Sequence, residues 1–165
     1  MEALKWMSIL AVCATLGILS AVGCGSDNLM DAAEDGNVTQ FSYAVSDCAG
    51  LTRPAAGKPA TFTDDAIKVS GNTISFDHIL ETYCNAKTDG ALQVTQVIDG
   101  QTIVVNEVFK GDAVYCVCPF PISGKIEGLA PGAYNLSFVY GVELVTSGYT
   151  QEPVVLYETT VTVSD

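Results

Sequence analysis

The chain has 165 residues, of which 48% are hydrophobic, and its 7 basic and 19 acidic residues give a formal net charge of −12. This length suits one domain with a sizeable core. Because an acidic surface repels the phosphates of nucleic acids and of anionic lipids, the charge excludes a DNA- or RNA-binding protein.

Residues 1–23 have the layout of a secretory signal peptide. Lys5 supplies a positive charge, an apolar run extends from Trp6 to Leu19, and small residues lead to Cys24. A cysteine at this point resembles the bacterial lipobox, in which the cysteine is lipidated and becomes the mature N-terminus. A retained membrane helix and plain secretion are the alternatives, but no cluster of Lys or Arg that would stop transfer follows the run. We therefore predict an exported lipoprotein with a membrane anchor at Cys24.

The residues behind the predicted anchor refine its location. Inner-membrane retention in many Gram-negative bacteria uses Asp directly after the lipidated cysteine, so Gly25 favours the outer membrane. Residues 24–37 are predicted to be the lipidated cysteine and an acidic, flexible tether, because they are acidic and have little periodicity. Residues 38–165 are then the folded domain.

Beyond residue 38 the patterns are those of short strands, with no helical periodicity of useful length. Strands are expected at 38–45, in a hairpin over 67–76 that turns at 70–72, in a hairpin of 91–98 and 102–109, and at 113–118, 121–127, 133–140 and 153–163. Asp99-Gly100 is predicted as the turn of the second hairpin, because this dipeptide tolerates positive φ angles. Seven to nine strands with turns between them predict an all-β, immunoglobulin-like or fibronectin-type two-sheet sandwich.

A Pro-Gly turn before one strand indicates a structural device of such sandwiches. The sequence Leu-Ala-Pro-Gly-Ala-Tyr at 129–134 precedes the alternating residues of 133–140. In immunoglobulin-like domains a tyrosine at this corner hydrogen-bonds back to the upstream backbone. Tyr134 is therefore predicted to be a structural corner, and an ordinary Pro-Gly turn is the alternative.

Four cysteines remain in the domain: Cys48, Cys84, Cys116 and Cys118. An even number in an oxidising compartment favours two disulfides, with the connectivity open. Cys116 and Cys118 point the same way along a strand, about 7 Å apart, which is too far for them to bridge each other. Each is therefore expected to pair with Cys48 or Cys84, and we predict that the disulfides tie one sheet to the other.

Alternation also places the single histidine of the chain. One face of the strand from residue 73 carries Ile74, Phe76, His78 and Leu80. This face is apolar and should point into the core, so His78 is expected to be buried there. Its predicted partner is Glu107, because Glu107 alternates with apolar residues on its own strand.

A second interpretation of the same residues is a metal site. His78, Cys84, Cys116 and Cys118 would supply one imidazole and three thiolates, a ligand set that suits zinc or copper(I). The spacing is not that of a zinc finger, and an oxidising compartment favours disulfides over free thiols. We therefore predict no cofactor, with zinc or copper as the alternative.

The order of these motifs resembles that of a group of small bacterial lipoproteins, many from Bacteroides and related organisms. The shared features, within about residues 74–140, are His78, a cysteine shortly after it, Cys-x-Cys-Pro at 116–119 and Gly-Leu-x-x-Gly-x-Tyr ending at Tyr134. The resemblance implies an immunoglobulin-like fold and an envelope location, and it implies no activity. Many members carry two cysteines where this chain has Cys84 alone, which weighs against shared metal chemistry.

The sequence contains no Gly-x-Ser-x-Gly elbow, no phosphate-binding glycine loop and no paired-histidine zinc motif. With its one histidine in the core, a Ser-His-Asp triad is disfavoured. We therefore predict no catalytic residues and no enzyme activity. The expected function is a membrane-anchored module that binds a partner protein or glycan through its loops or strand edges. A metal-binding protein and a protease inhibitor with an exposed loop are the alternatives.

Overall fold

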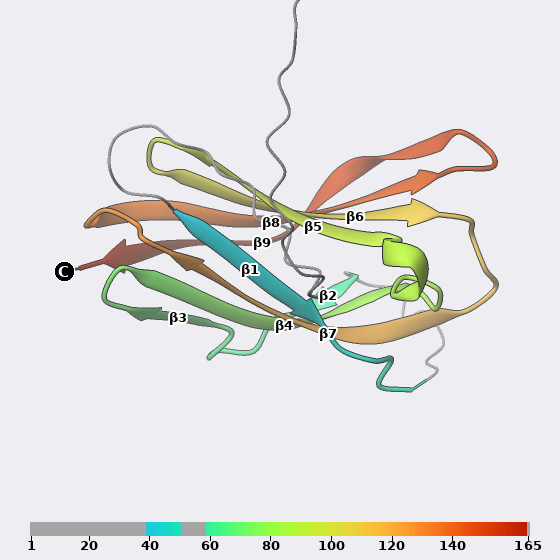
Figure 1. Ribbon diagram of the computed structural model, residues 1–165, viewed down its shortest axis with the longest axis horizontal. Coiled ribbons are helices and arrows are strands. Elements are labelled where there is room, and N and C mark those ends of the chain that lie inside the picture. Colours follow the sequence, from blue (N-terminus) through green and yellow to red (C-terminus); the bar gives the residue numbers. More distant parts are fainter. Residues whose placement is uncertain (1–38, 51–58, 165) are drawn as a thin grey trace, which may run out of the picture.

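The computed structural model describes residues 39–50 and 59–164. The predicted signal peptide, Cys24 and the tether lie outside these residues. The strands, shown in Figure 1, are β1 (Gln40–Val45), β2 (Ala60–Thr61), β3 (Ile67–Ser70), β4 (Thr73–Tyr83), β5 (Leu92–Asp99), β6 (Thr102–Gly111), β7 (Val117–Glu127), β8 (Gly132–Leu144) and β9 (Tyr149–Val163). One short 3₁₀ helix, η1 (Thr88–Gly90), precedes β5.

The strands form two sheets. In sheet A the order is β1-β7-β4-β2, and β3 also pairs with β4. In sheet B the order is β5-β6-β8-β9. The prediction of an all-β two-sheet sandwich is confirmed, with nine strands in the described residues. One pair differs from the purely antiparallel sheets of immunoglobulin domains, because β6 and β8 are parallel. These two strands are joined through β7, which lies in the other sheet.

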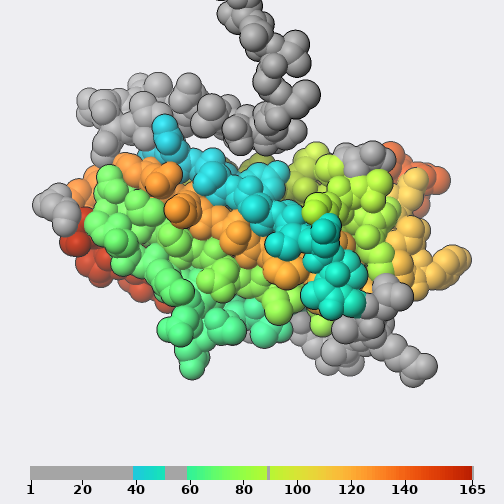
Figure 2. Space-filling model, turned by 60° about the horizontal axis from the view of Figure 1, so that its bottom comes forward, coloured from blue at the N-terminus to red at the C-terminus, as the bar shows by residue number. Residues whose placement is uncertain are grey.

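The core lies between the sheets and follows the alternation of each strand. On β4 every second residue from Ile74 to Thr82 is buried, and His78 is among them, as expected. The largest fully buried side chains come from both sheets and include Phe109, Phe120, Phe138, Ile74, Leu80, Ile103 and Leu136. In Figure 2, β1, β7, β4 and β3 lie side by side across the outer face of sheet A.

Strand β7 is continuous where two strands, 113–118 and 121–127, are predicted. The prediction of two strands is wrong, because Pro119 and Pro121 do not interrupt the pairing of β7 with β4. Cys84 donates its N–H to the carbonyl of Cys116, so the odd-numbered residues of β7 point their backbone groups away from β4. The missing N–H groups of both prolines therefore face the β1 side, where regular pairing ends at Val45 with Ile122. The proline carbonyls still accept hydrogen bonds there.

Two further strand boundaries differ from the prediction. The β5–β6 turn consists of Gly100 and Gln101 rather than Asp99 and Gly100, because Asp99 still pairs with Thr102. Gly100 has a φ of 57°, a value that suits glycine. The strands β8 and β9 are each longer than expected and meet in a hairpin over 145–148. The short strand β2 is not among the predicted strands.

The sandwich has two chemically different ends. The corner end holds the turns at 71–72, 100–101 and 128–131, which are tied by the hydrogen bonds Leu129 N–H to Asn72 C=O and Asn135 N–H to Gln101 C=O. The disulfide end holds the connections at 84–91, 112–116 and 145–148. Strand β1 starts and β9 finishes at the corner end, on the left of Figure 1. Both described termini therefore leave the domain opposite the disulfide end.

Candidate functional site

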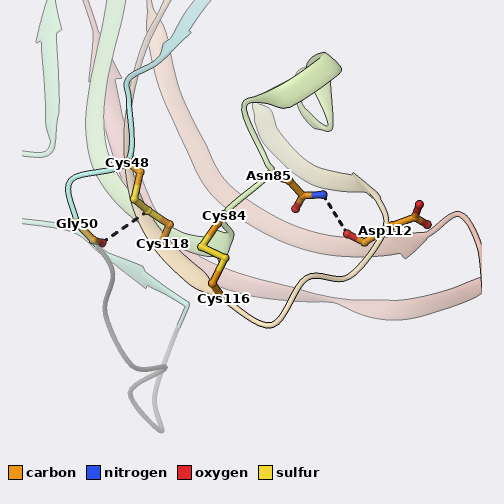
Figure 3. Close-up of a disulfide and its surroundings, with 7 residues drawn as sticks. All are labelled: Cys48, Gly50, Cys84, Asn85, Asp112, Cys116 and Cys118. Atoms are coloured by element: carbon orange, nitrogen blue, oxygen red, sulfur yellow. Dashed lines mark hydrogen bonds between the residues drawn. A yellow bond between two sulfur atoms is a disulfide. The ribbon is translucent and has the colours of Figure 1, made fainter.

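All four cysteines of the domain are paired at the disulfide end. Cys48 bonds to Cys118 and Cys84 bonds to Cys116, with Cα–Cα distances of 5.7 and 5.6 Å (Figure 3). Both distances lie in the normal range for a disulfide. As expected, Cys116 and Cys118 do not bridge each other. Each instead bonds to a cysteine that lies more than 30 residues away along the chain.

Neither disulfide joins the two sheets, so the prediction of sheet-to-sheet bridges is wrong. Cys84 directly follows β4 and Cys116 directly precedes β7, and these strands are neighbours in sheet A. Cys48 lies beyond β1, next to the β7 residue Cys118, also in sheet A. The two disulfides therefore link the ends of three adjacent strands, β1, β7 and β4, within one sheet. Alternation along β7 placed the side chains on a face, but it could not identify the partner strand.

Polar contacts join the connections of the disulfide end to one another. The Asn85 side chain donates to the Asp112 carbonyl at 3.1 Å (Figure 3), and the Asp112 carboxylate accepts from both the backbone N–H and the hydroxyl of Thr146. Lys87 contacts Asp47 at 2.6 Å, and this exposed ion pair holds the pKa of Asp47 below its usual value. The three connections therefore form one cross-linked surface rather than separate loops.

His78 and Glu107 meet between the sheets. The His78 Nε2 lies 2.8 Å from the Glu107 Oε1, and both side chains are fully buried. The ring N–H does not align with the carboxylate as a hydrogen bond requires, and the His78 Nδ1 and the Glu107 Oε2 have no partner in the described part of the chain. The pair is thus a close polar contact in the core with incomplete hydrogen bonding. Such a pair is costly to desolvate and more costly to break by removing one member.

Aromatic rings enclose the histidine. Phe62 stacks on His78 with ring centroids 4.4 Å apart and on Tyr157 at 4.6 Å, and Phe138 meets the imidazole edge-on at 5.4 Å. Because His78 and Glu107 have no exposed side-chain surface, no substrate reaches them in this conformation. Their arrangement supports packing between sheets rather than acid–base chemistry on an external molecule.

A second polar contact crosses the core nearby. The hydroxyls of Thr82 on β4 and Tyr140 on β8 are 2.6 Å apart, and both residues are buried. Burial raises the pKa of Tyr140 to about 12, the hydrogen bond with Thr82 acts in the opposite direction, and the charges of Tyr83 and Glu107 add to the rise. Sequence reasoning missed this contact, because nothing in the alternation of either strand distinguishes Thr82 or Tyr140 from the other residues on the same face.

The alternative metal set is not brought together. Cys84, Cys116 and Cys118 have their sulfurs in disulfides at one end, whereas His78 contacts Glu107 in the core. No group of three or more His, Cys, Asp or Glu side chains that could hold a metal occurs among the described residues. A bonded sulfur is not a thiolate, so these four residues do not form a zinc or copper site in this structure.

Tyr134 occupies the corner between β7 and β8. Its hydroxyl donates to the carbonyl of Ala130 at 2.9 Å, and the ring is buried against the core. This is the upstream backbone hydrogen bond by which the tyrosine corner is defined. The residue closes the corner end of the sandwich and touches no candidate binding surface.

Three exposed apolar side chains mark the disulfide end, and sequence reasoning did not single them out. Tyr115 is fully exposed next to Cys116, and Val145 and Tyr149 flank the β8–β9 turn with exposures of 72% and 54%. Their connections are joined by the contact of Asp112 with Thr146. The one sequence signal that could have pointed here is Tyr115 directly before Cys116.

Comparison with known proteins identifies no relative of this chain. No family model, no curated protein and no solved structure matches the chain. Over the described ranges, none of the helical structure is long and apolar enough to cross a bilayer.

Proposed function

We propose that this protein is an exported, lipid-anchored module of the bacterial envelope that binds a partner protein through its disulfide end. The observation that carries the proposal is the placement of the termini. The described chain begins at β1 and finishes after β9 at the corner end, opposite the exposed side chains of Tyr115, Val145 and Tyr149. An anchor at Cys24 would present those side chains away from the membrane.

The chemistry of this surface favours a protein partner. Tyrosine is enriched among the residues that dominate binding energy in protein interfaces, and Tyr115 and Tyr149 are two of the three exposed side chains. The cross-linking of the three connections lowers the entropy that the surface would lose on binding.

A photo-crosslinking experiment in the organism that produces the protein tests the binding surface. A photoreactive amino acid at Tyr115 or at Val145 is expected to capture a discrete partner protein. The matched control is the same amino acid at Val69, an apolar side chain of β3 that is 37% exposed and lies away from the disulfide end. Equal capture from all three positions, or none from Tyr115 and Val145, would count against the proposal. Capture of a glycan instead would replace the partner class.

The anchor is tested separately. Intact mass of the membrane-bound protein is expected to show a lipidated N-terminus at Cys24, and Cys24→Ser is expected to release the chain from the outer-membrane fraction. A Cys24→Ser protein that stays in the membrane with an uncleaved N-terminus would favour the retained helix.

The protease-inhibitor alternative is favoured by one observation. The connection at 112–116 is held at one end by Asp112 and at the other by the Cys84–Cys116 disulfide, with Tyr115 fully exposed between them. A panel of serine and cysteine proteases assayed with the oxidised domain tests it. Inhibition that Tyr115→Ala abolishes would support the alternative, and uniform lack of inhibition would end it.

A further inference from the structure

The two edges of sheet B are unequally protected against pairing with another chain. The edge strand β9 carries Glu152, Pro153 and Glu158, and its pairing with β8 has two register shifts. Charged residues, proline and β-bulges hinder the pairing of an edge strand with a strand of another chain. The other edge strand, β5, has none of them between Leu92 and Ile98, and it pairs with β6 in continuous register.

The backbone groups on the free side of β5 can be identified from its hydrogen bonds. Ala91 accepts from the N–H of Lys110, so its groups face β6, whereas Leu92 donates its N–H to Ala86 at 2.7 Å. The N–H and C=O of one residue point to the same side, and successive residues alternate. The even-numbered residues that follow Leu92 therefore direct both groups outward. These are Val94, Gln96 and Ile98, whose outward groups have no backbone partner in the described residues.

The central residue of this edge also carries an unpaired side-chain atom. Gln96 points to the core face of β5, and its amide Oε1 is shielded from water with no hydrogen-bond partner among the described residues. A shielded amide oxygen without a partner costs free energy that a donor on a neighbouring molecule could recover.

We propose that β5 pairs with β5 of a second copy of this chain, antiparallel and across a two-fold axis that passes beside Gln96. In this register Gln96 lies opposite the partner's Gln96, and Val94 lies opposite the partner's Ile98. Each opposed pair exchanges two backbone hydrogen bonds, because all of these residues direct their groups outward. The two Gln96 amides face each other, so each Oε1 gains a donor from the other side chain. Sheet B becomes one continuous sheet through both protomers.

The charges of β5 agree with a self-pairing strand. In this register the one charged residue of the strand, Asp99, lies opposite the partner's Gln93, so no like charges are opposed along the ladder. The net charge of −12 on each protomer opposes association over longer distances, and salt screens that repulsion. Dimerisation is therefore expected to strengthen as ionic strength rises.

The oligomeric state of the predicted mature chain, residues 24–165 with Cys24→Ser, is the first test. Sedimentation equilibrium from about 1 μM to about 1 mM is expected to show a monomer–dimer equilibrium that shifts toward dimer with added salt. Gln96→Lys opposes two charges at the axis and is expected to weaken the dimer at least tenfold. Gln151→Lys, the same change on the protected edge strand β9, should leave it unchanged. A chain that remains monomeric at about 1 mM overturns the proposal.

Hydrogen exchange tests the surface and the register in the same protein. The amides of Val94, Gln96 and Ile98 are expected to exchange slowly at high concentration and fast at low concentration. The amides of Thr95 and Val97 bond to β6 in either state and serve as internal controls. A dimer in which the three even-numbered amides exchange equally fast at both concentrations would place the interface elsewhere and refute the proposal.

Discussion

The two sheets of this sandwich are stabilised in different ways. Sheet A holds both disulfides, and its central strand β7 pairs with β1 and β4, which are far from it in the sequence. Sheet B contains no cysteine, and two of its three pairings, β5–β6 and β8–β9, are hairpins with short turns. The entropy cost of bringing strands together rises with the length of chain between them. The disulfides therefore occur in the sheet in which bringing neighbouring strands together costs the most conformational entropy.

A different chemistry joins the sheets to each other. The contacts of His78 with Glu107 and of Thr82 with Tyr140 cross from β4 to sheet B inside an otherwise apolar core. Apolar side chains fill space in many arrangements, whereas buried polar groups are satisfied in few. We infer that these contacts set how the sheets face one another, and the following experiments separate their contribution from that of the disulfides.

Removal of the disulfides should have the largest effect. The bonds span sequence separations of 70 and 32 residues, so chain entropy predicts that Cys48→Ala/Cys118→Ala and Cys84→Ala/Cys116→Ala each lower the free energy of unfolding by about 4 kcal/mol. Denaturant unfolding measures the loss. Hydrogen exchange should show that β1 and β7 lose protection before β8 and β9. Equal loss in both sheets would contradict the comparison.

Breaking the buried contact between His78 and Glu107 should have the next largest effect. Glu107→Leu or His78→Leu leaves one polar partner alone in the core, and each is expected to lower the free energy of unfolding by about 3 kcal/mol. The double variant removes both polar groups and should recover most of this loss. Denaturant unfolding of the four proteins gives the coupling energy. Additive losses in the double variant would mean that the two side chains do not act as a pair.

Alkaline pH should weaken the sandwich through Tyr140. Its pKa is about 12 in the folded protein against 10.0 for the free side chain, so folded protein keeps a proton that unfolded protein releases. The stability contribution is complete below pH 10 and is lost as the pH rises from 10 to 12, by about 3 kcal/mol. Urea unfolding between pH 8 and 12 measures it. Tyr140→Phe is the control, and a Phe variant with the same pH slope would assign the effect to another group.

Loss of the corner hydrogen bond should have the smallest effect. Tyr134→Phe keeps the buried ring and removes the donor to the Ala130 carbonyl, so a loss of about 1 kcal/mol is expected in thermal or denaturant unfolding. Tyr149→Phe, at an exposed tyrosine of the other end, should change nothing measurable. A loss as large as that from a disulfide would show that the corner end depends on one side chain more than its backbone contacts indicate.

Several features of this fold were readable from the sequence alone, because they depend on neighbours along the chain. Alternation of apolar residues placed His78 in the core, and a Gly-Asn turn and an Asp-Gly turn marked both early hairpins, to within one residue at the second. The Pro-Gly segment before Tyr134 indicated its corner. Each of these signals is an alternation of side chains or a set of turn residues, and a stretch of about ten residues is long enough to show it.

Other features were decided only by the tertiary structure. The partner of each cysteine, the parallel pairing of β6 with β8 and the continuity of β7 through Pro119 and Pro121 depend on which distant strands become neighbours. The same holds for the exposed surface that Tyr115 and Val145 form at the disulfide end. Local sequence specifies the face on which a side chain lies. The strand that meets that face is selected by the packing of the whole core, which no short segment contains.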